Sequence, residues 1–101
     1  MIRIKQLQRE SGASYRQLDY WCRRGVIFTL NDQMPGSGQY REFDEKIIPR
    51  VRLLATFSKA LGVAPHLEIM KDLYDAYPKG EFQIGDGDGL KLVWDVEVND
   101  D

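Results

Sequence analysis

Residues 13–27, which read ASYRQLDYWCRRGVI, combine helix punctuation with many aromatic and basic side chains. Ser14 is a residue type that caps helix N-termini, and Gln17, three positions later, completes the pattern of a capping box. The apolar side chains recur at helical spacing: Leu18, Trp21 and Cys22. Gly25 then ends the predicted helix. This stretch predicts a helix with one buried face and one exposed face.

A shorter helical pattern precedes it. Ile4, Leu7 and Gln8 begin a helix that runs to about Ser11, where Gly12 supplies the left-handed residue that ends it. Two helices joined by a Gly-Ala turn form a helix-turn-helix, in which the second helix can lie in a DNA groove while the first braces it. We therefore predict a helix-turn-helix at the start of the chain.

The residues that follow predict a small hairpin, or wing. VIFTL at residues 26–30 is a short β-prone run, NDQMPGSG is a turn-forming loop, and QYREF at residues 39–43 is a second β-prone run. Tyr40 and Phe43 are the large side chains of that second run. We expect the two runs to pair as antiparallel strands.

A long helix is predicted next, from a cap at Asp44 to about Leu61, with Gly62 as its stop. Its stripe of apolar and small residues is Ile47, Ile48, Val51, Leu54, Ala55 and Ser58. Pro49 lacks a backbone donor, so we expect either a kink there or a helix that begins near Ile48. Another helix is expected from Pro65, a residue that suits the first helical position, to about Pro78.

The end of the chain alternates apolar and polar residues at period two. EFQI and LKLVWDVEV, separated by GDGDG, predict a terminal hairpin. One face of its second strand is strongly apolar: Leu90, Leu92, Trp94, Val96 and Val98. Such a face should be covered. Either the helix from Pro65 or the same strand of another copy could cover it, and in both cases the acidic residues should face away from DNA.

The totals fit one compact domain over residues 1–80 and an acidic C-terminal hairpin or tail over residues 81–101. The chain has no run of about 18 apolar residues, and its start, MIRIKQLQRE, lacks the apolar stretch of a signal peptide. We expect a cytoplasmic protein without a membrane partner. The fold class expected is mainly α with small β.

Positive and negative side chains separate along the chain, whose formal net charge is −2. Residues 1–59 hold eleven Lys/Arg and six Asp/Glu, a net charge of +5. Residues 60–101 hold three Lys/Arg and ten Asp/Glu, a net charge of −7. A basic front and an acidic back predict one part that faces a polyanion and another that faces something else.

The predicted second helix carries the groups that duplex DNA can bond. Off its apolar stripe lie Tyr15, Arg16, Gln17, Asp19, Tyr20, Arg23 and Arg24. Arginine can bond guanine bidentately, glutamine can bond adenine, and Tyr and Ser hydroxyls can bond phosphate oxygens. Residues near the N-terminus of such a helix reach deepest into the groove.

From Ile4 to about Leu73 the chain resembles the MerR-type winged helix-turn-helix domain. IKQLQRESGAS is similar to its first helix and turn, LDYWCRRGVI to the end of its recognition helix, SGQYREFD to its wing, and LGVAPHLEIMKDL to its last helix pair. The spacing of four glycines also agrees: Gly12, Gly25, Gly38 and Gly62. The resemblance implies a winged helix-turn-helix and a helix pair, to which the period-two pattern adds the C-terminal β-hairpin.

The resemblance also implies that the second helix enters the major groove and that the wing contacts the flanking backbone. The candidate DNA-binding residues are Ser14, Tyr15, Arg16, Gln17, Tyr20, Arg23, Gln39, Tyr40 and Arg41. Two features depart from the family. Asp19 stands where an arginine is usual and should be tolerated or paired with Arg16 or Arg23. No long coiled-coil helix follows, so effector-gated promoter distortion is not expected.

Two functions remain open at this point. The first is a sequence-specific double-stranded DNA-binding protein, either a small transcription regulator or an excisionase-like architectural factor of a phage or mobile element. The second is a protein-interaction module that keeps the fold without binding DNA, favoured by Asp19 and the sequence pI near 5.4. The expected partners are double-stranded DNA, a homodimer or multimer on DNA, and a protein at the acidic C-terminal part.

Enzymatic chemistry is not indicated. The only cysteine, Cys22, should be a buried small hydrophobe, and the only histidine, His66, should be a surface or partly packed residue. GDGDG at residues 85–89 lacks the further ligands of an EF-hand loop and predicts a plain turn. With no phosphate-binding loop and no metal cluster in the sequence, we expect no enzyme, no metal and no cofactor.

Overall fold

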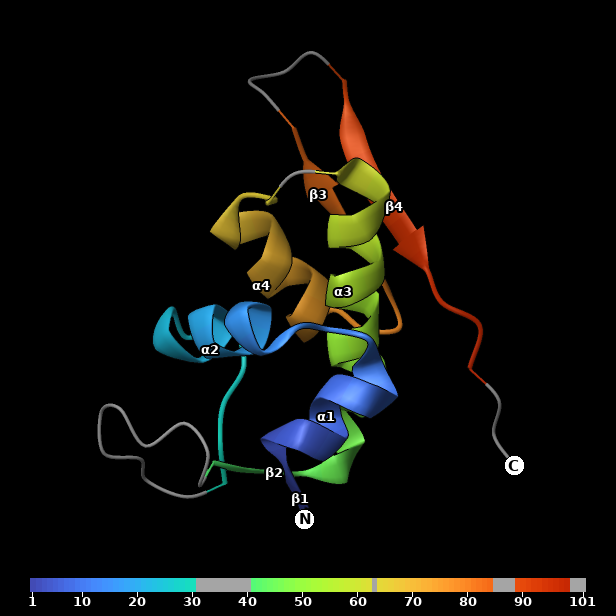
Figure 1. Cartoon of the computed structure of the whole chain (residues 1–101). Helices are drawn as coiled ribbons and strands as arrows, with labels where there is room; N and C mark the ends of the chain where they lie inside the picture. Colours follow the sequence, from blue (N-terminus) through green and yellow to red (C-terminus); the bar gives the residue numbers. More distant parts are fainter. Residues whose placement is uncertain (31–40, 63, 85–88, 99–101) are drawn as a thin grey trace.

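The structure is a computed structural model that describes residues 1–30, 41–62, 64–84 and 89–98. These residues form four α-helices and two small antiparallel sheets, arranged as in Figure 1, which confirms the predicted mainly α fold with small β. In chain order the elements are β1 (Ile2–Arg3), α1 (Ile4–Ser11), α2 (Tyr15–Arg23), β2 (Glu42–Phe43), the 3-10 helix η2 (Glu45–Ile47), α3 (Ile48–Leu61), α4 (Leu67–Asp75), β3 (Lys79–Gln83) and β4 (Lys91–Asp95).

The helix-turn-helix has the predicted bounds. α1 ends at Gly12, whose φ of 82° is left-handed backbone that a glycine adopts without strain. The capping box of α2 is complete: Gln17 N donates to Ser14 Oγ at 3.1 Å, and Ser14 N donates to Gln17 Oε1 at 3.0 Å. Reciprocal capping of this kind holds the start of α2 in a single backbone geometry.

Within the described residues, the predicted pairing of residues 26–30 with residues 39–43 is limited to one hydrogen bond, in which Leu30 N donates to Glu42 O at 2.7 Å. β2 pairs antiparallel with β1, with Ile2 opposite Phe43, and the described residues 26–30 contain no strand. Val26 and Ile27 are buried in the core, and their N–H groups donate to the carbonyl of Trp21 at 2.9 and 3.3 Å. Burial and these bonds to the end of α2 override their β preference. Residues 31–40 lie outside the described part of the chain.

α3 starts where Pro49 allows. Asp44 caps the short helix η2, because its Oδ1 accepts from Lys46 N at 2.9 Å, and α3 then begins at Ile48 with the proline in its first turn. The alternative of a helix that begins near Ile48 is therefore confirmed. Gly62 ends the helix at a φ of 74°, as predicted.

α4 begins two residues later than predicted. His66 rather than Pro65 stands at its boundary, and His66 Nδ1 accepts from Glu68 N at 3.2 Å. This bond makes His66 the N-cap residue, which lies just outside the helix, so Pro65 lies before the helix. The imidazole of His66 is exposed, as expected, and serves here as a helix cap.

β3 and β4 form the predicted terminal hairpin. The predicted boundary between the domain of residues 1–80 and the tail of residues 81–101 falls inside β3. The same chain covers only the middle of its apolar face: Trp94 is 7% exposed, belongs to the main core, and donates from Nε1 to Ala76 O at 3.4 Å, whereas Leu90 and Val98 remain 63% and 47% exposed. Gly80 lies opposite Trp94, where a Cβ would stand 2.6 Å from Trp94 Cζ2. Of the predicted turn, only Gly89 lies within the described residues.

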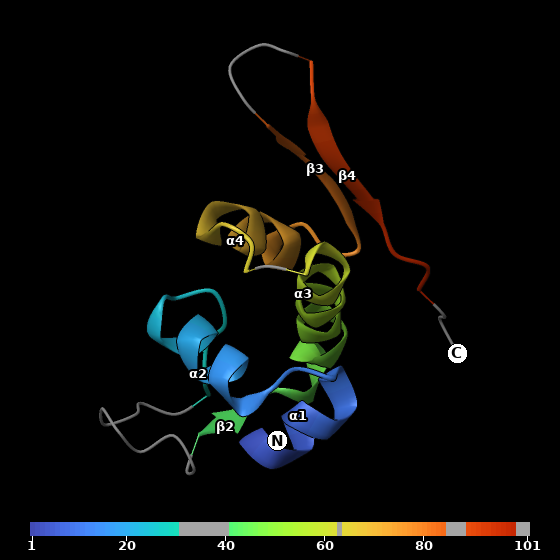
Figure 2. The same cartoon turned by 45° about the horizontal axis from the view of Figure 1, so that its top comes forward.

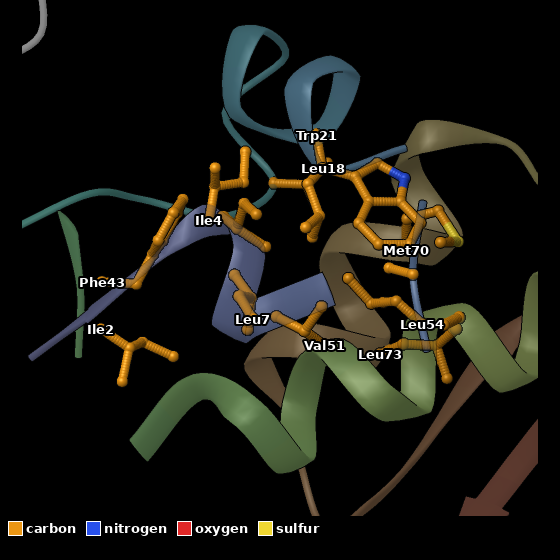
Figure 3. Packing of buried hydrophobic residues seen from close by; sticks show 14 of the residues in the cluster. Ile2, Ile4, Leu7, Leu18, Trp21, Phe43, Val51, Leu54, Met70 and Leu73 are labelled. Atoms are coloured by element: carbon orange, nitrogen blue, oxygen red, sulfur yellow. The ribbon is translucent and has the colours of Figure 1, made fainter. Parts of the chain in front are cut away.

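A single hydrophobic core joins the helices, as Figure 3 shows from close by. Its fully buried members come from every helix around it: Leu7 of α1, Leu18 of α2, Val51 and Leu54 of α3, and Met70 and Leu73 of α4. Trp21 of α2 lies in the same cluster beside Met70. α2 is therefore fixed on its inner side, and its outer side is free to present polar groups.

Candidate nucleic-acid interface

The outer side of α2 is exposed, aromatic and basic. Leu18 and Trp21 are buried, whereas Tyr15 and Tyr20 keep 45% and 43% of their surface and Arg16 is exposed. Figures 1 and 2 show α2 on one side of α3 and β4 on the other. α3 thus lies between α2 and β4.

Ser14 and Gln17 have a different immediate use from the one that the sequence suggests. Both were candidates for DNA contact, and in the structure the two side chains bond each other's backbone N–H groups in the capping box. They set the direction in which α2 leaves the turn. Arg16, the second residue of the helix, is held at this capped end with its own side chain exposed.

Asp19, the residue that departs from the family pattern, is paired on two sides. Its Oδ2 lies 3.1 Å from Arg23 Nε, one turn later on α2, and its Oδ1 lies 2.9 Å from Arg41 Nη1. The pairing with Arg23 was one of the two predicted, and Arg16 is not a partner in these pairs. The carboxylate on the outer helix is therefore balanced by two guanidinium groups.

Arg41 differs most from the sequence expectation. The wing pattern predicts an exposed side chain that reaches phosphate, yet the side chain of Arg41 is 9% exposed and that of Asp19 is 22% exposed. A buried guanidinium needs a carboxylate partner because desolvating a lone charge is costly. Asp19 supplies this carboxylate to Arg41. The other wing candidates, Gln39 and Tyr40, lie outside the described residues.

Further basic groups line the outer helix. Arg23 keeps 68% of its side chain exposed while it pairs with Asp19. The guanidinium of Arg24 lies over the ring of Tyr20, with 5.5 Å between its carbon and the ring centroid. This contact restrains Tyr20 and Arg24 together at the C-terminal end of α2.

The turn between the helices is braced by residues that the sequence patterns did not single out. Ser11 Oγ donates to Leu7 O at 2.6 Å and accepts from Ala13 N at 3.2 Å. From α3, Arg52 donates to the carbonyl of Glu10 through Nε at 3.1 Å and Nη2 at 2.8 Å. These bonds use the free carbonyl at the end of α1 and tie the turn to α3.

A groove of about 740 Å³ runs beside the exposed face of α2, between that helix, the end of α3 and the segment before α4. Arg16 and Tyr20 line it on the α2 side, and Lys59 lines it on the α3 side. Basic side chains thus continue from α2 onto α3 across the groove.

Cys22 lies behind the interface. Burial raises the pKa of its thiol from 9.0 to about 11, against an opposing effect of nearby Arg41 and a smaller raising effect of Asp19. The thiol is therefore protonated at neutral pH and is a poor nucleophile. Within the described ranges, no group of three or more His, Cys, Asp or Glu side chains is placed to hold a metal ion.

Residues 2–66 match the family model described as MerR HTH family regulatory protein. The chain belongs to this family. MerR proteins are DNA-binding regulators rather than enzymes, and the matched residues carry α1, α2, β2 and α3 of the MerR domain seen here. The match ends at His66, so α4 and the hairpin lie beyond it. Neither the curated proteins nor the solved structures that were compared gave a match.

In the part of this MerR protein that the structure describes, no helix combines the length and the apolar character required to span a bilayer.

Proposed function

We propose that the protein binds double-stranded DNA sequence-specifically, as a small transcription regulator or an excisionase-like architectural factor, with α2 in the major groove. The observation that carries the proposal is the outer face of α2, where Tyr15, Arg16 and Tyr20 are exposed above a fully packed inner face. A rigid helix with such a face meets the requirement for reading base edges.

Arg16 is the principal reader in this proposal. It lies in the first turn of α2, the part of a recognition helix that goes deepest into the groove, and its guanidinium can bond both acceptors of a guanine. The exposed residues around it supply phosphate contacts: Tyr15, Tyr20, Arg23 and Arg24. Ser14 and Gln17 orient Arg16 through the capping box.

The pairing of Asp19 removes the main argument for the protein-interaction alternative. An unpaired carboxylate on the outer helix would repel phosphate. Asp19 instead lies within 3.1 Å of both Arg23 and Arg41, so the three side chains together carry a net positive charge. This supports DNA contact by the surface that contains Asp19.

The placement of the acidic residues supports the same orientation. Glu81, Asp95 and Glu97 are exposed on the hairpin or just after it, and Figure 1 shows β4 across α3 from α2. With α2 in the groove, these carboxylates are held away from the phosphates.

A gel-shift titration of the purified protein against random duplexes, at low and moderate salt, tests the proposal. We expect binding whose logarithm falls steeply with the logarithm of salt concentration, since neutralising phosphates releases counterions. Sequencing the bound fraction should show an enriched motif. Binding without enrichment would remove sequence specificity, and no binding even at low salt would overturn the proposal in favour of a protein-interaction module.

A further inference from the structure

β4 has one open edge. It pairs with β3 on one side, and no other strand among the described residues pairs with it. Ile84 N donates to Leu90 O at 2.9 Å, and Val96 N donates to Pro78 O at 2.8 Å, so the backbone groups of Leu90 and Val96 face β3. These groups alternate along an antiparallel strand. Those of Lys91, Val93 and Asp95 therefore point to the open edge.

The side chains of the same three residues share the outer face of the hairpin. Leu92 and Trp94, between them, pack inward against the core, while Lys91, Val93 and Asp95 are exposed. Val93 keeps 61% of its surface, although it stands in the middle of a strand between two charged residues. An edge strand with an exposed valine at its centre is open to pairing with another chain.

We propose that β4 pairs antiparallel with β4 of a second copy, about a two-fold axis at Val93. In this register Lys91 faces Asp95 of the partner subunit, and Val93 faces Val93 of the partner subunit. Lys91, Val93 and Asp95 are also the residues whose backbone N–H and C=O groups point to the open edge. Each facing pair can therefore exchange two backbone hydrogen bonds. The result is a four-stranded sheet with the two copies of β4 in its centre.

Charge selects this partner and this register. A parallel in-register arrangement would put Lys91 against Lys91 and Asp95 against Asp95, which is unfavourable. An antiparallel arrangement shifted by two residues would leave a charge opposite Val93. Only the arrangement centred on Val93 pairs each charge with its opposite and the valine with a valine, because the sequence Lys91–Val93–Asp95 is complementary to itself when read backwards.

The position of β4 keeps the proposed contact away from α2. β4 lies on the opposite side of α3 from α2, as Figures 1 and 2 show, so pairing through its edge leaves both copies of α2 exposed. Inside each copy, Lys91 Nζ lies 3.3 Å from Glu81 Oε2, with half or more of both side chains exposed. An exposed pair of this kind contributes little, so Lys91 is available to a second carboxylate.

Two charge variants test the register. Lys91→Asp makes both charged positions of the strand acidic, and Asp95→Lys makes both basic. Light scattering and sedimentation should show a concentration-dependent dimer for the unaltered protein and a monomer for each variant alone. An equimolar mixture of the variants should form a heterodimer, since every acidic position then faces a basic one. The recovered dimer also shows that both variants are folded.

Val93→Pro provides a matched test of the edge itself. The N–H of Val93 points away from β3, so a proline there removes an intermolecular donor while the β3–β4 hydrogen bonds remain. Circular dichroism and the melting temperature at low protein concentration should stay near those of the monomer, and the dimer should be lost. A monomeric parent at every soluble concentration, a mixture that stays monomeric, or a dimer that survives Val93→Pro would overturn the proposal.

Discussion

Arg41 Nη1 lies 2.9 Å from Asp19 Oδ1, and this pair joins the segment before β2 to the middle of α2. The two residues are 22 positions apart in the sequence. Asp19 is the one acidic residue of α2, and of its two arginine partners Arg23 is exposed whereas Arg41 is largely buried. We therefore expect Arg41 to hold α2 in place through Asp19.

Replacing Arg41 with alanine should lower the stability of the fold and leave the salt dependence of DNA binding unchanged. Asp19 would lose its buried partner but keep Arg23, so we expect a cost of about 1–3 kcal/mol in the free energy of unfolding. Denaturant unfolding measures this, with Arg41→Lys as a milder control. At temperatures where the variant is folded, the salt slope of DNA binding should be unchanged. A slope lowered by about one with full stability would identify Arg41 as a phosphate contact.

Replacing Arg16 with alanine should do the opposite. The side chain is exposed, so the melting temperature should hardly change, whereas DNA affinity should fall by about 1–3 kcal/mol and preference at one base position should relax. Competition gel shifts with base-substituted duplexes measure both effects. Lys46→Ala, which removes an exposed positive charge from η2, is the matched control. Equal losses in the two variants would mean that Arg16 contributes only its charge.

Gly80→Ala should loosen the hairpin from the body. The added Cβ would stand 2.6 Å from Trp94 Cζ2 and 2.8 Å from the Cβ of Ala76, so backbone or indole must shift, and overpacking of this kind costs about 1–3 kcal/mol. Chemical denaturation monitored by circular dichroism gives the loss. Lys79→Ala, on the exposed neighbour, should stay within about 0.5 kcal/mol of the parent. Unchanged stability in Gly80→Ala would show that the indole is not held where the structure places it.

Because of the Cys22 thiol, the free energy of unfolding should depend on pH in the alkaline range. Its pKa is raised from 9.0 to about 11 in the folded protein, so the unfolded chain loses this proton first. Stability from this source is complete below pH 9.0 and declines as the pH rises toward about 11. Denaturation midpoints across this range should fall less in Cys22→Ala than in the parent. Iodoacetamide should also label the folded thiol slowly at pH 8 and the unfolded thiol readily, and fast labelling of both would contradict the raised pKa.

The helices could be predicted from the sequence because their signals act over a few residues. Ser14 and Gln17 cap each other across one turn, and Gly12 and Gly62 end their helices by their own backbone conformation. The strand pairing of β1 with β2 could not be predicted in the same way. A two-residue strand has no periodicity, and its partner lies about forty residues away in sequence.

The candidate site was predictable to the same extent. The exposed face of α2 follows from the spacing of Leu18 and Trp21, which fixes the buried side. The partner of Asp19 that comes from outside the helix, Arg41, does not follow, since only neighbours on the same helix can be paired by spacing. Arg52 was missed for a similar reason: its bond to the carbonyl of Glu10 depends on how α1 and α3 cross.

The core that joins the two ends of the chain also sets its optical behaviour. Trp21 in the helix-turn-helix and Trp94 in the terminal hairpin are the only indoles of the chain, and both are buried in one hydrophobic cluster. Their fluorescence emission should therefore be blue-shifted in the native state and move to longer wavelength in one common transition on unfolding. If the hairpin melted before the helices, Trp94 alone would report it, and the emission of a Trp21→Phe variant would shift at lower denaturant than that of Trp94→Phe.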